Sequence, residues 1–128
     1  MRKALSLVLA VLLAACLGGC AMPPSQEEIA KADYGPFPPA YQEMVKSAFS
    51  QMLKDPYSAV YEFHGDPVKG YYVNPPIKGG GVTYGWCGNV SVNAKNSYGG
   101  YTGSEEWFYV IRNFSVRVLT PRSEMRSQ

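Results

Sequence analysis

The segment Val82-Thr83-Tyr84-Gly85-Trp86-Cys87-Gly88-Asn89-Val90-Ser91-Val92 is the clearest strand in the 128-residue sequence. Its larger apolar side chains lie on one face of an extended chain: Val82, Tyr84, Trp86, Val90 and Val92. The opposite face carries smaller or polar side chains: Thr83, Cys87, Asn89 and Ser91. Alternation with a period of two is typical of a half-buried strand, and the two glycines allow a bulge or a close backbone approach. The segment predicts the central strand of a sheet.

Shorter strand candidates surround this central strand. They are Val60–Phe63 and Val68–Val73 before it, and residues 106–112 and 114–119 after it. Turn-forming sequences such as His64-Gly65-Asp66-Pro67 separate neighbouring strands. In the last strand, the side chains expected to face inward are Phe114, Val116 and Val118. Consecutive strands joined in this way predict an antiparallel sheet.

Upstream of the strands, apolar side chains recur every three or four residues: Tyr41, Met44, Val45, Ala48, Phe49, Met52 and Leu53. This spacing predicts an amphipathic helix that begins at Pro39 or Ala40. The helix should end before Asp55-Pro56, because proline disfavours helical geometry at the residue before it. The sequence thus predicts a single α+β domain over residues 39–120, with one amphipathic N-terminal helix packed on a curled antiparallel sheet of four to five strands.

The N-terminus has the organisation of a secretory signal peptide, with a basic start, an apolar run and small residues before a cysteine. Leu17-Gly18-Gly19-Cys20 resembles the lipobox of bacterial lipoproteins, in which the cysteine is lipidated and becomes the new N-terminus. We therefore expect residues 1–19 to be removed and Cys20 to carry the lipid. Cys16 is the alternative anchor, and cleavage without lipidation is the third possibility.

The resemblance to lipoproteins also implies a location. Ala21 follows Cys20, and it is not the Asp that resembles an inner-membrane retention signal. We expect the chain in the bacterial cell envelope, held by lipid in the outer membrane and facing the periplasm. Residues 20–38 are rich in proline and predict an extended tether, in which a short helix near residues 26–32 would be marginal on its own. Residues 121–128 predict a polar tail.

Composition excludes several classes of partner and site. Removal of Arg2 and Lys3 with the signal peptide leaves ten basic against ten acidic residues. Without a basic stripe, no nucleic-acid partner is expected. If Cys20 is lipidated, Cys87 is the last thiol and has no intramolecular disulfide partner. One histidine and scattered carboxylates do not make a metal site, so we expect no metal and no cofactor.

The most distinctive motif runs from Cys87 to Gly103 and reads Cys-Gly-Asn-Val-Ser-Val-Asn-Ala-Lys-Asn-Ser-Tyr-Gly-Gly-Tyr-Thr-Gly. It resembles a family of small, uncharacterised bacterial exported proteins and lipoproteins with a Cys-Gly pair and an Asn-Ala-Lys-Asn-Ser-aromatic-Gly-Gly-Tyr-Thr-Gly core. The Asp55-Pro56-Tyr57-Ser58-Ala59 turn resembles the same family, and the likeness covers roughly residues 39–112. The resemblance implies an exported protein and supplies no mechanism.

Two interpretations of the loop within this motif are open. Glycine and asparagine permit positive φ and dense backbone hydrogen bonding, and tyrosine offers an amphipathic ring. A recognition loop would bind an envelope protein or a glycan through Asn93, Lys95, Asn96, Ser97, Tyr98 and Tyr101. A structural loop would instead fold back over the sheet, with its tyrosines filling the core. We expect Tyr98 to be exposed and Tyr101 to be structural.

Catalytic groups are few. A Cys87–His64–Asp66 arrangement would make a thiol hydrolase, because the nucleophile needs a base beside it, and Lys95 near Ser97 would make a Ser-Lys pair. The spacing supports neither of them. We expect Cys87 to be a small buried hydrophobe.

The sequence therefore favours a membrane-anchored, non-enzymatic binding or scaffolding module over an enzyme. One alternative is a periplasmic inhibitor similar to the lipoprotein inhibitors of lysozyme, which would use Ser97, Tyr98 and Tyr101. The other alternative is a small cysteine- or serine-dependent hydrolase. The expected partners are the membrane, through the N-terminal lipid, and an envelope protein or glycan.

Overall fold

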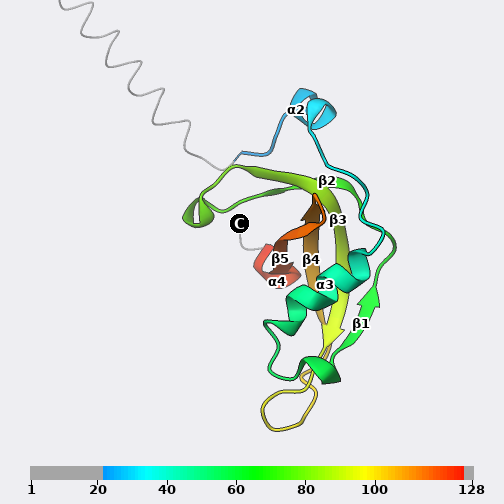
Figure 1. Cartoon of the computed structure of the whole chain (residues 1–128). Coiled ribbons are helices and arrows are strands. Elements are labelled where there is room, and N and C mark those ends of the chain that lie inside the picture. Colours follow the sequence, from blue (N-terminus) through cyan, green and yellow to red (C-terminus); the bar gives the residue numbers. More distant parts are fainter. Residues whose placement is uncertain (1–21, 126–128) are drawn as a thin grey trace, which may run out of the picture.

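The computed structural model describes residues 22–125 and shows a small α+β fold with an open antiparallel sheet of five strands (Figure 1). This confirms the predicted fold class and the antiparallel pairing. The strands are β1 (Val60–Phe63), β2 (Val68–Val73), β3 (Val82–Asn93), β4 (Glu105–Arg112) and β5 (Ser115–Pro121). The helices are α2 (Gln26–Lys31), α3 (Tyr41–Ser50) and α4 (Arg122–Met125), with the short 3-10 turns η2 (Pro56–Ser58) and η3 (Pro76–Lys78). No helix in this part of the chain is long and apolar enough to cross a membrane.

β3 is the central strand, as its alternation predicts. One of its edges pairs with β4 over residues 86–92. Its other edge is shared, because β2 pairs with residues 82–87 and β1 pairs with residues 90–93. β5 adds a further strand beyond β4. One bent strand of 12 residues therefore serves three partners and connects the two ends of the sheet (Figure 1).

The first hydrophobic core lies between α3 and one face of the sheet. α3 buries Tyr41, Val45 and Phe49, and the sheet contributes Val90, Val92, Tyr109 and Ile111. The ring of Phe49 meets the ring of Trp107 edge to face, with the ring centres 5.0 Å apart. The helix ends at Ser50, earlier than its apolar stripe predicts. Met52 therefore lies beyond the helix with 52% of its surface exposed, which corrects its expected place in the stripe.

A second, smaller core lies on the opposite face of the sheet. It contains Tyr72, Cys87 and Val110, with Phe108, Val118 and Met125 packed against them. Neighbouring residues of β4 alternate between the two cores because successive side chains of a strand point to opposite faces. The burial of Cys87 is as predicted, with 8% of its surface exposed.

The C-terminal segment completes this second core. Pro121 ends β5, Arg122–Met125 form α4, and Met125 packs on the second core. The first part of the expected polar tail, residues 121–125, is therefore ordered, and Met125 contacts the second core while residues 122–124 are exposed. The sequence prediction of a polar tail did not account for the apolar side chain of Met125.

A bulge in β5 explains a second difference from the sequence expectation. Val110 pairs with Val118, but Ile111 pairs with Val116, so Arg117 is an extra residue in β5. An extra residue reverses the alternation, and Val116 packs on the first core while Val118 packs on the second. Phe114 does not face inward either; it lies in the β4–β5 turn with 59% of its surface exposed.

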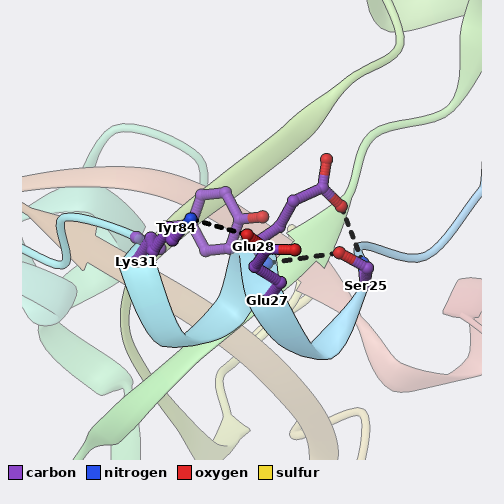
Figure 2. A pocket seen from close by; sticks show the side chains of 6 residues that line it. Ser25, Glu27, Glu28, Lys31 and Tyr84 are labelled. Carbon is purple, nitrogen blue, oxygen red and sulfur yellow. Dashed lines mark hydrogen bonds and ion pairs between the residues drawn. The ribbon is translucent and has the colours of Figure 1, made fainter.

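The expected tether contains an ordered helix. α2 begins at a capping box, in which the Ser25 side chain accepts the Glu28 backbone N–H and the Glu28 carboxylate accepts the Ser25 backbone N–H (Figure 2). This reciprocal pair satisfies two backbone donors that a helix start otherwise leaves free. The capping box stabilises this short helix, whose length alone predicts that it would be marginal.

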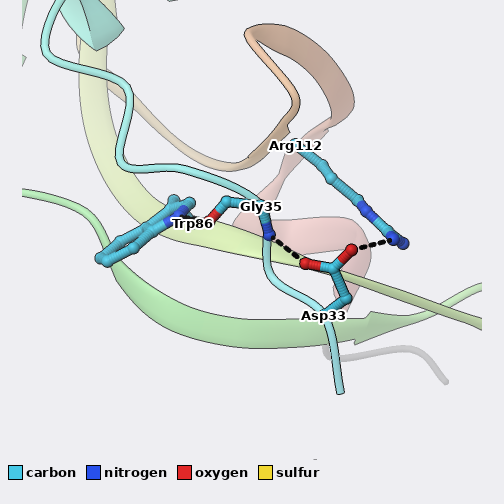
Figure 3. Close-up of polar contacts among 4 residues, drawn as sticks. All are labelled: Asp33, Gly35, Trp86 and Arg112. Carbon is cyan, nitrogen blue, oxygen red and sulfur yellow. Dashed lines mark hydrogen bonds and ion pairs between the residues drawn. The ribbon is translucent and has the colours of Figure 1, made fainter.

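The chain that follows α2 lies against the sheet. The indole N–H of Trp86 donates to the Gly35 carbonyl at 3.0 Å (Figure 3). The Asp33 carboxylate accepts the Gly35 backbone N–H at 2.9 Å, and its second oxygen lies 3.4 Å from Nη2 of Arg112. These contacts join a segment near the N-terminus to β3 and to the end of β4.

Apolar contacts strengthen this attachment. The ring of Phe37 meets Trp86 edge to face with centres 5.0 Å apart, and Pro38 is fully buried. We call residues 33–38 the docked segment. Its packing corrects the expectation that residues 20–38 form an extended spacer throughout, because this aromatic contact and the burial of Pro38 offset the entropy of ordering the proline-rich chain.

Candidate functional site

The predicted recognition loop joins β3 to β4 and extends beyond the end of the sheet (Figure 1, yellow). Lys95 and Tyr101 form a backbone bridge across its base. The side-chain oxygen of Asn96 organises the tip, where it accepts the backbone N–H groups of Tyr98 at 2.9 Å and Gly100 at 3.2 Å. The Asn96 N–H in turn donates to the Gly100 carbonyl at 2.9 Å. The tip is therefore a closed, hydrogen-bonded turn.

Ser58 of η2 attaches this loop to the rest of the domain. Its hydroxyl oxygen accepts the Lys95 backbone N–H at 2.9 Å, and its carbonyl accepts the Tyr101 hydroxyl at 3.2 Å. The Ser58 hydroxyl itself donates to the Asp55 carbonyl at 2.8 Å. The turn at residues 55–59 and the loop motif are therefore parts of one structure.

The loop and the neighbouring turn η2 display aromatic side chains to solvent. Tyr98 is 96% exposed, as predicted, and Tyr101 is 52% exposed. Tyr57, which precedes Ser58 in η2, is fully exposed. The structure contradicts the version of the loop in which tyrosines fill the core, because neither loop tyrosine belongs to either core. The ring of Tyr101 therefore does not fill the sheet edge as expected, and this side chain is attached to the fold through the hydrogen bond from its hydroxyl to the Ser58 carbonyl.

The six candidate loop residues divide by position. Asn93 ends β3, and its side-chain oxygen is shielded from solvent without a hydrogen-bond partner among the described residues. The ammonium of Lys95 lies over the ring of Tyr101, 5.5 Å from its centre. The exposed tip is formed by Asn96, Ser97 and Tyr98. Sequence reasoning missed Tyr57, although it singled out the turn that carries it.

The structure does not assemble the cysteine site considered from the sequence. Cys87 lies in the second core, where burial raises the pKa of its thiol to about 12. Asp66 accepts a hydrogen bond from the Tyr41 hydroxyl at 2.8 Å and so connects the β1–β2 turn to α3. His64 contacts neither of them. A thiolate nucleophile needs a lowered pKa and access to substrate, and Cys87 has neither.

His64 instead contacts two residues that sequence reasoning did not select. Its Nε2 lies 2.8 Å from Oγ of Ser91 and 3.3 Å from a carboxylate oxygen of Glu106. A serine hydrolase site places the serine on one ring nitrogen and the carboxylate on the other. Here both partners contact the same nitrogen, so the group connects the residue after β1 to β3 and β4 without that geometry. Only the strand register brings these residues together, and no local sequence signal reports it.

A shallow hollow of about 750 Å³ lies between α2 and β3 (Figure 2). The charged groups around it already have partners within α2. Lys31 pairs with Glu27 at 2.6 Å, and Glu28 caps Ser25. Tyr84 forms the opposite side, and burial followed by the charge of Glu28 raises its pKa above the ordinary value. We assign this hollow no ligand.

No three His, Cys, Asp or Glu side chains within residues 22–125 come together as a metal site. Comparisons with protein-family models, curated proteins and solved structures find no match to this chain. The resemblance of the loop motif to exported proteins therefore stays a prediction. Cys16 and Cys20 lie outside the described residues.

Proposed function

We propose that this chain is a membrane-anchored envelope lipoprotein whose domain is a non-enzymatic binding module, with the β3–β4 loop tip as its recognition surface. The observation that carries the proposal is a fixed backbone that presents exposed aromatic rings. Asn96 closes the tip, Ser58 holds its base, and Tyr57, Tyr98 and Tyr101 face solvent.

Such an arrangement favours binding for two physical reasons. Tyrosine supplies a large amphipathic contact area with few rotatable bonds, which is why it is enriched where proteins bind partners. A loop that is already held in one conformation loses little entropy when a partner binds. Tyr98 makes no core contact, so the fold itself gives no reason for a ring at this position.

The position of the loop supports the same proposal. The described chain begins near α2 at one end of the sheet, and the loop extends from the opposite end (Figure 1). With a lipid at Cys20, the loop would be directed away from the anchoring membrane. An envelope protein or a glycan, which carries hydroxyl groups and apolar sugar faces for tyrosine to contact, fits this surface.

The proposal is tested by photo-crosslinking in the bacterial envelope. A photo-reactive amino acid replaces Tyr98 in the full chain, and the matched control carries it at Val68, which is 65% exposed on β2. We expect a discrete adduct with protein or peptidoglycan from position 98 and none from position 68. Equal adducts at both positions, or none at position 98, would contradict the proposal.

An inhibitor of lysozyme is the more specific version of this function. The observation that favours it is the exposed Ser97 beside Tyr98 at the tip. It predicts that the purified domain slows cell-wall hydrolysis by lysozyme and that Tyr98→Ala removes the effect. Crosslinks from position 98 together with unimpeded lysozyme would reject the inhibitor and retain the binding module.

A further inference from the structure

A pocket beside the β4–β5 turn presents two arginine side chains. It has a volume of about 410 Å³ and lies at the opposite end of the sheet from the recognition loop. Its lining contains no carboxylate and consists of Val82, Thr83, Arg112, Asn113 and Arg117. Two guanidinium groups around one open space repel each other unless an anion lies between them.

The bulge in β5 places one of these arginines. Arg117 is the extra residue between Val116 and Val118, and bulges commonly change the direction of a side chain. Arg117 is exposed and has no ion pair within residues 22–125. Its hydrogen-bonding capacity is therefore not used by the described part of the fold.

The second arginine is only partly satisfied. Nη2 of Arg112 lies 3.4 Å from the Asp33 carboxylate, whose side chain is 77% exposed (Figure 3). Exposed ion pairs contribute little and are screened by salt. Nε of Arg112 is shielded from solvent and has no acceptor among the described residues. An unsatisfied buried donor is unfavourable, so a side-chain adjustment that brings an anionic oxygen to this guanidinium would be stabilising.

We propose that this pocket is a binding site for a phosphate group. A phosphate offers several anionic oxygens, and the planar fork of arginine matches them through paired hydrogen bonds. Arg112 and Arg117 would each contribute a fork, and the amide of Asn113 would add neutral donors. Thr83 would form the wall, because its hydroxyl is already paired with the side chain of Asn74.

The phosphate group has two possible sources, a membrane lipid headgroup and a soluble phosphorylated molecule. The pocket lies at the same end of the sheet as α2, and Asp33 of the docked segment contacts one of its arginines. A lipid source rests on the proposed membrane anchor, whereas the phosphate chemistry of the pocket does not. Two probes, inorganic phosphate and lipid vesicles, distinguish these two sources.

The test uses the chain from residue 21 to residue 128, which contains both cores and every contact described above. Inorganic phosphate is titrated while backbone amide NMR signals are recorded. We expect saturable shifts confined to residues 82–83 and 112–117. Arg117→Gln should weaken binding about tenfold, because one charge-assisted contact is lost. The matched control, Lys54→Gln, removes an equal charge outside the pocket and should leave binding unchanged.

The second probe is sedimentation with vesicles of phosphatidylcholine alone or mixed equally with phosphatidylglycerol. Binding to the mixed vesicles that Arg117→Gln abolishes assigns the pocket to a lipid headgroup. Phosphate shifts without vesicle binding assign it to a soluble phosphate group. The proposal is overturned if phosphate moves no signal at residues 112–117, or if Lys54→Gln weakens binding as much as Arg117→Gln. Crosslinking at position 98 is independent of either result.

Discussion

The hydroxyl of Tyr109 occupies the space that a side chain on Gly88 would need. The two residues face each other across β3 and β4, and a Cβ atom on Gly88 would overlap the oxygen and ring of Tyr109. Tyr109 is fully buried in the first core, and its hydroxyl has no hydrogen-bond partner among the described residues. Gly88 is therefore required by close packing, since its φ is not among the positive values of this chain.

The first prediction follows from this contact. Gly88→Ala should lower the free energy of unfolding by about 1–3 kcal/mol, the usual cost of overfilling a packed core. Gly100→Ala is the matched control, because the nearest atom to its added Cβ is 3.9 Å away and its φ is not positive. Chemical denaturation of both variants gives the measurement. A Gly88→Ala protein as stable as the Gly100→Ala protein would show that the ring of Tyr109 moves freely.

Truncation of Phe49 and truncation of Met52 should have very different effects on the free energy of unfolding. Phe49 is completely buried, so Phe49→Ala should lower the free energy of unfolding by about 3–5 kcal/mol. Met52→Ala should lower it by less than about 1 kcal/mol, because Met52 is half exposed beyond the end of α3. The two denaturation midpoints test this, and equal losses would mean that α3 extends through Met52 in solution.

Substitutions of the two loop tyrosines should have different effects, with Tyr98 affecting partner binding and Tyr101 affecting stability. Tyr98→Ala should leave the melting temperature unchanged and reduce the partner crosslinking described above. Tyr101→Phe should lower the free energy of unfolding by about 0.5–1.5 kcal/mol, because it removes the hydroxyl that bonds to Ser58. A drop in melting temperature for Tyr98→Ala would contradict the recognition surface and support a purely structural role for the loop.

Cys87 predicts a loss of stability at high pH. Burial raises the pKa of its thiol from 9.0 to about 12, so above pH 9 the unfolded chain releases a proton that the folded chain keeps. The free energy of unfolding should therefore fall between about pH 9 and pH 12, with a slope of up to about 1.4 kcal/mol per pH unit from this thiol. Cys87→Ala should show a shallower slope over pH 9–10. Identical slopes for the wild type and Cys87→Ala would mean that the thiol ionises normally in the folded protein.

The membrane anchor is tested by palmitate labelling in cells. The wild type should label and fractionate with membranes, and Cys20→Ser should lose both properties. Cys16→Ser is the control and should label normally. Labelling that survives Cys20→Ser but not Cys16→Ser would move the anchor to Cys16, and no labelling of any form would end the lipoprotein proposal.

Local patterns in the sequence predict the strands well and their long-range contacts poorly. Val60–Phe63 and Val68–Val73 have the predicted bounds, because alternation and turn residues are local signals. The position of Val118 is not predictable in this way. The bulge at Arg117 depends on how β5 aligns with β4, and no residue within β5 indicates that a bulge will form.

The same limit applies to the candidate site. The exposure of Tyr98 follows from a polar, glycine-rich loop, and the sequence predicts it. The role of Ser58 requires a hydrogen bond to a backbone group 37 residues away, and the pairing of Arg112 with Asp33 spans 79 residues. Such partners are decided by tertiary packing, which is why the docked segment was expected to be free.

The docked segment also limits how far the domain can stand from a membrane. With the lipid on Cys20, only residues 21–32 separate the bilayer from the first residue fixed to the sheet. With six of these residues coiled in α2, that chain reaches about 30 Å at most, comparable to the hydrocarbon thickness of one bilayer. The greatest height of the loop tip above the lipid surface is then this reach added to the length of the rigid domain. With the lipid on Cys20, a partner of the tip would have to lie within that distance of the lipid surface, and one deeper in the periplasm would be out of reach.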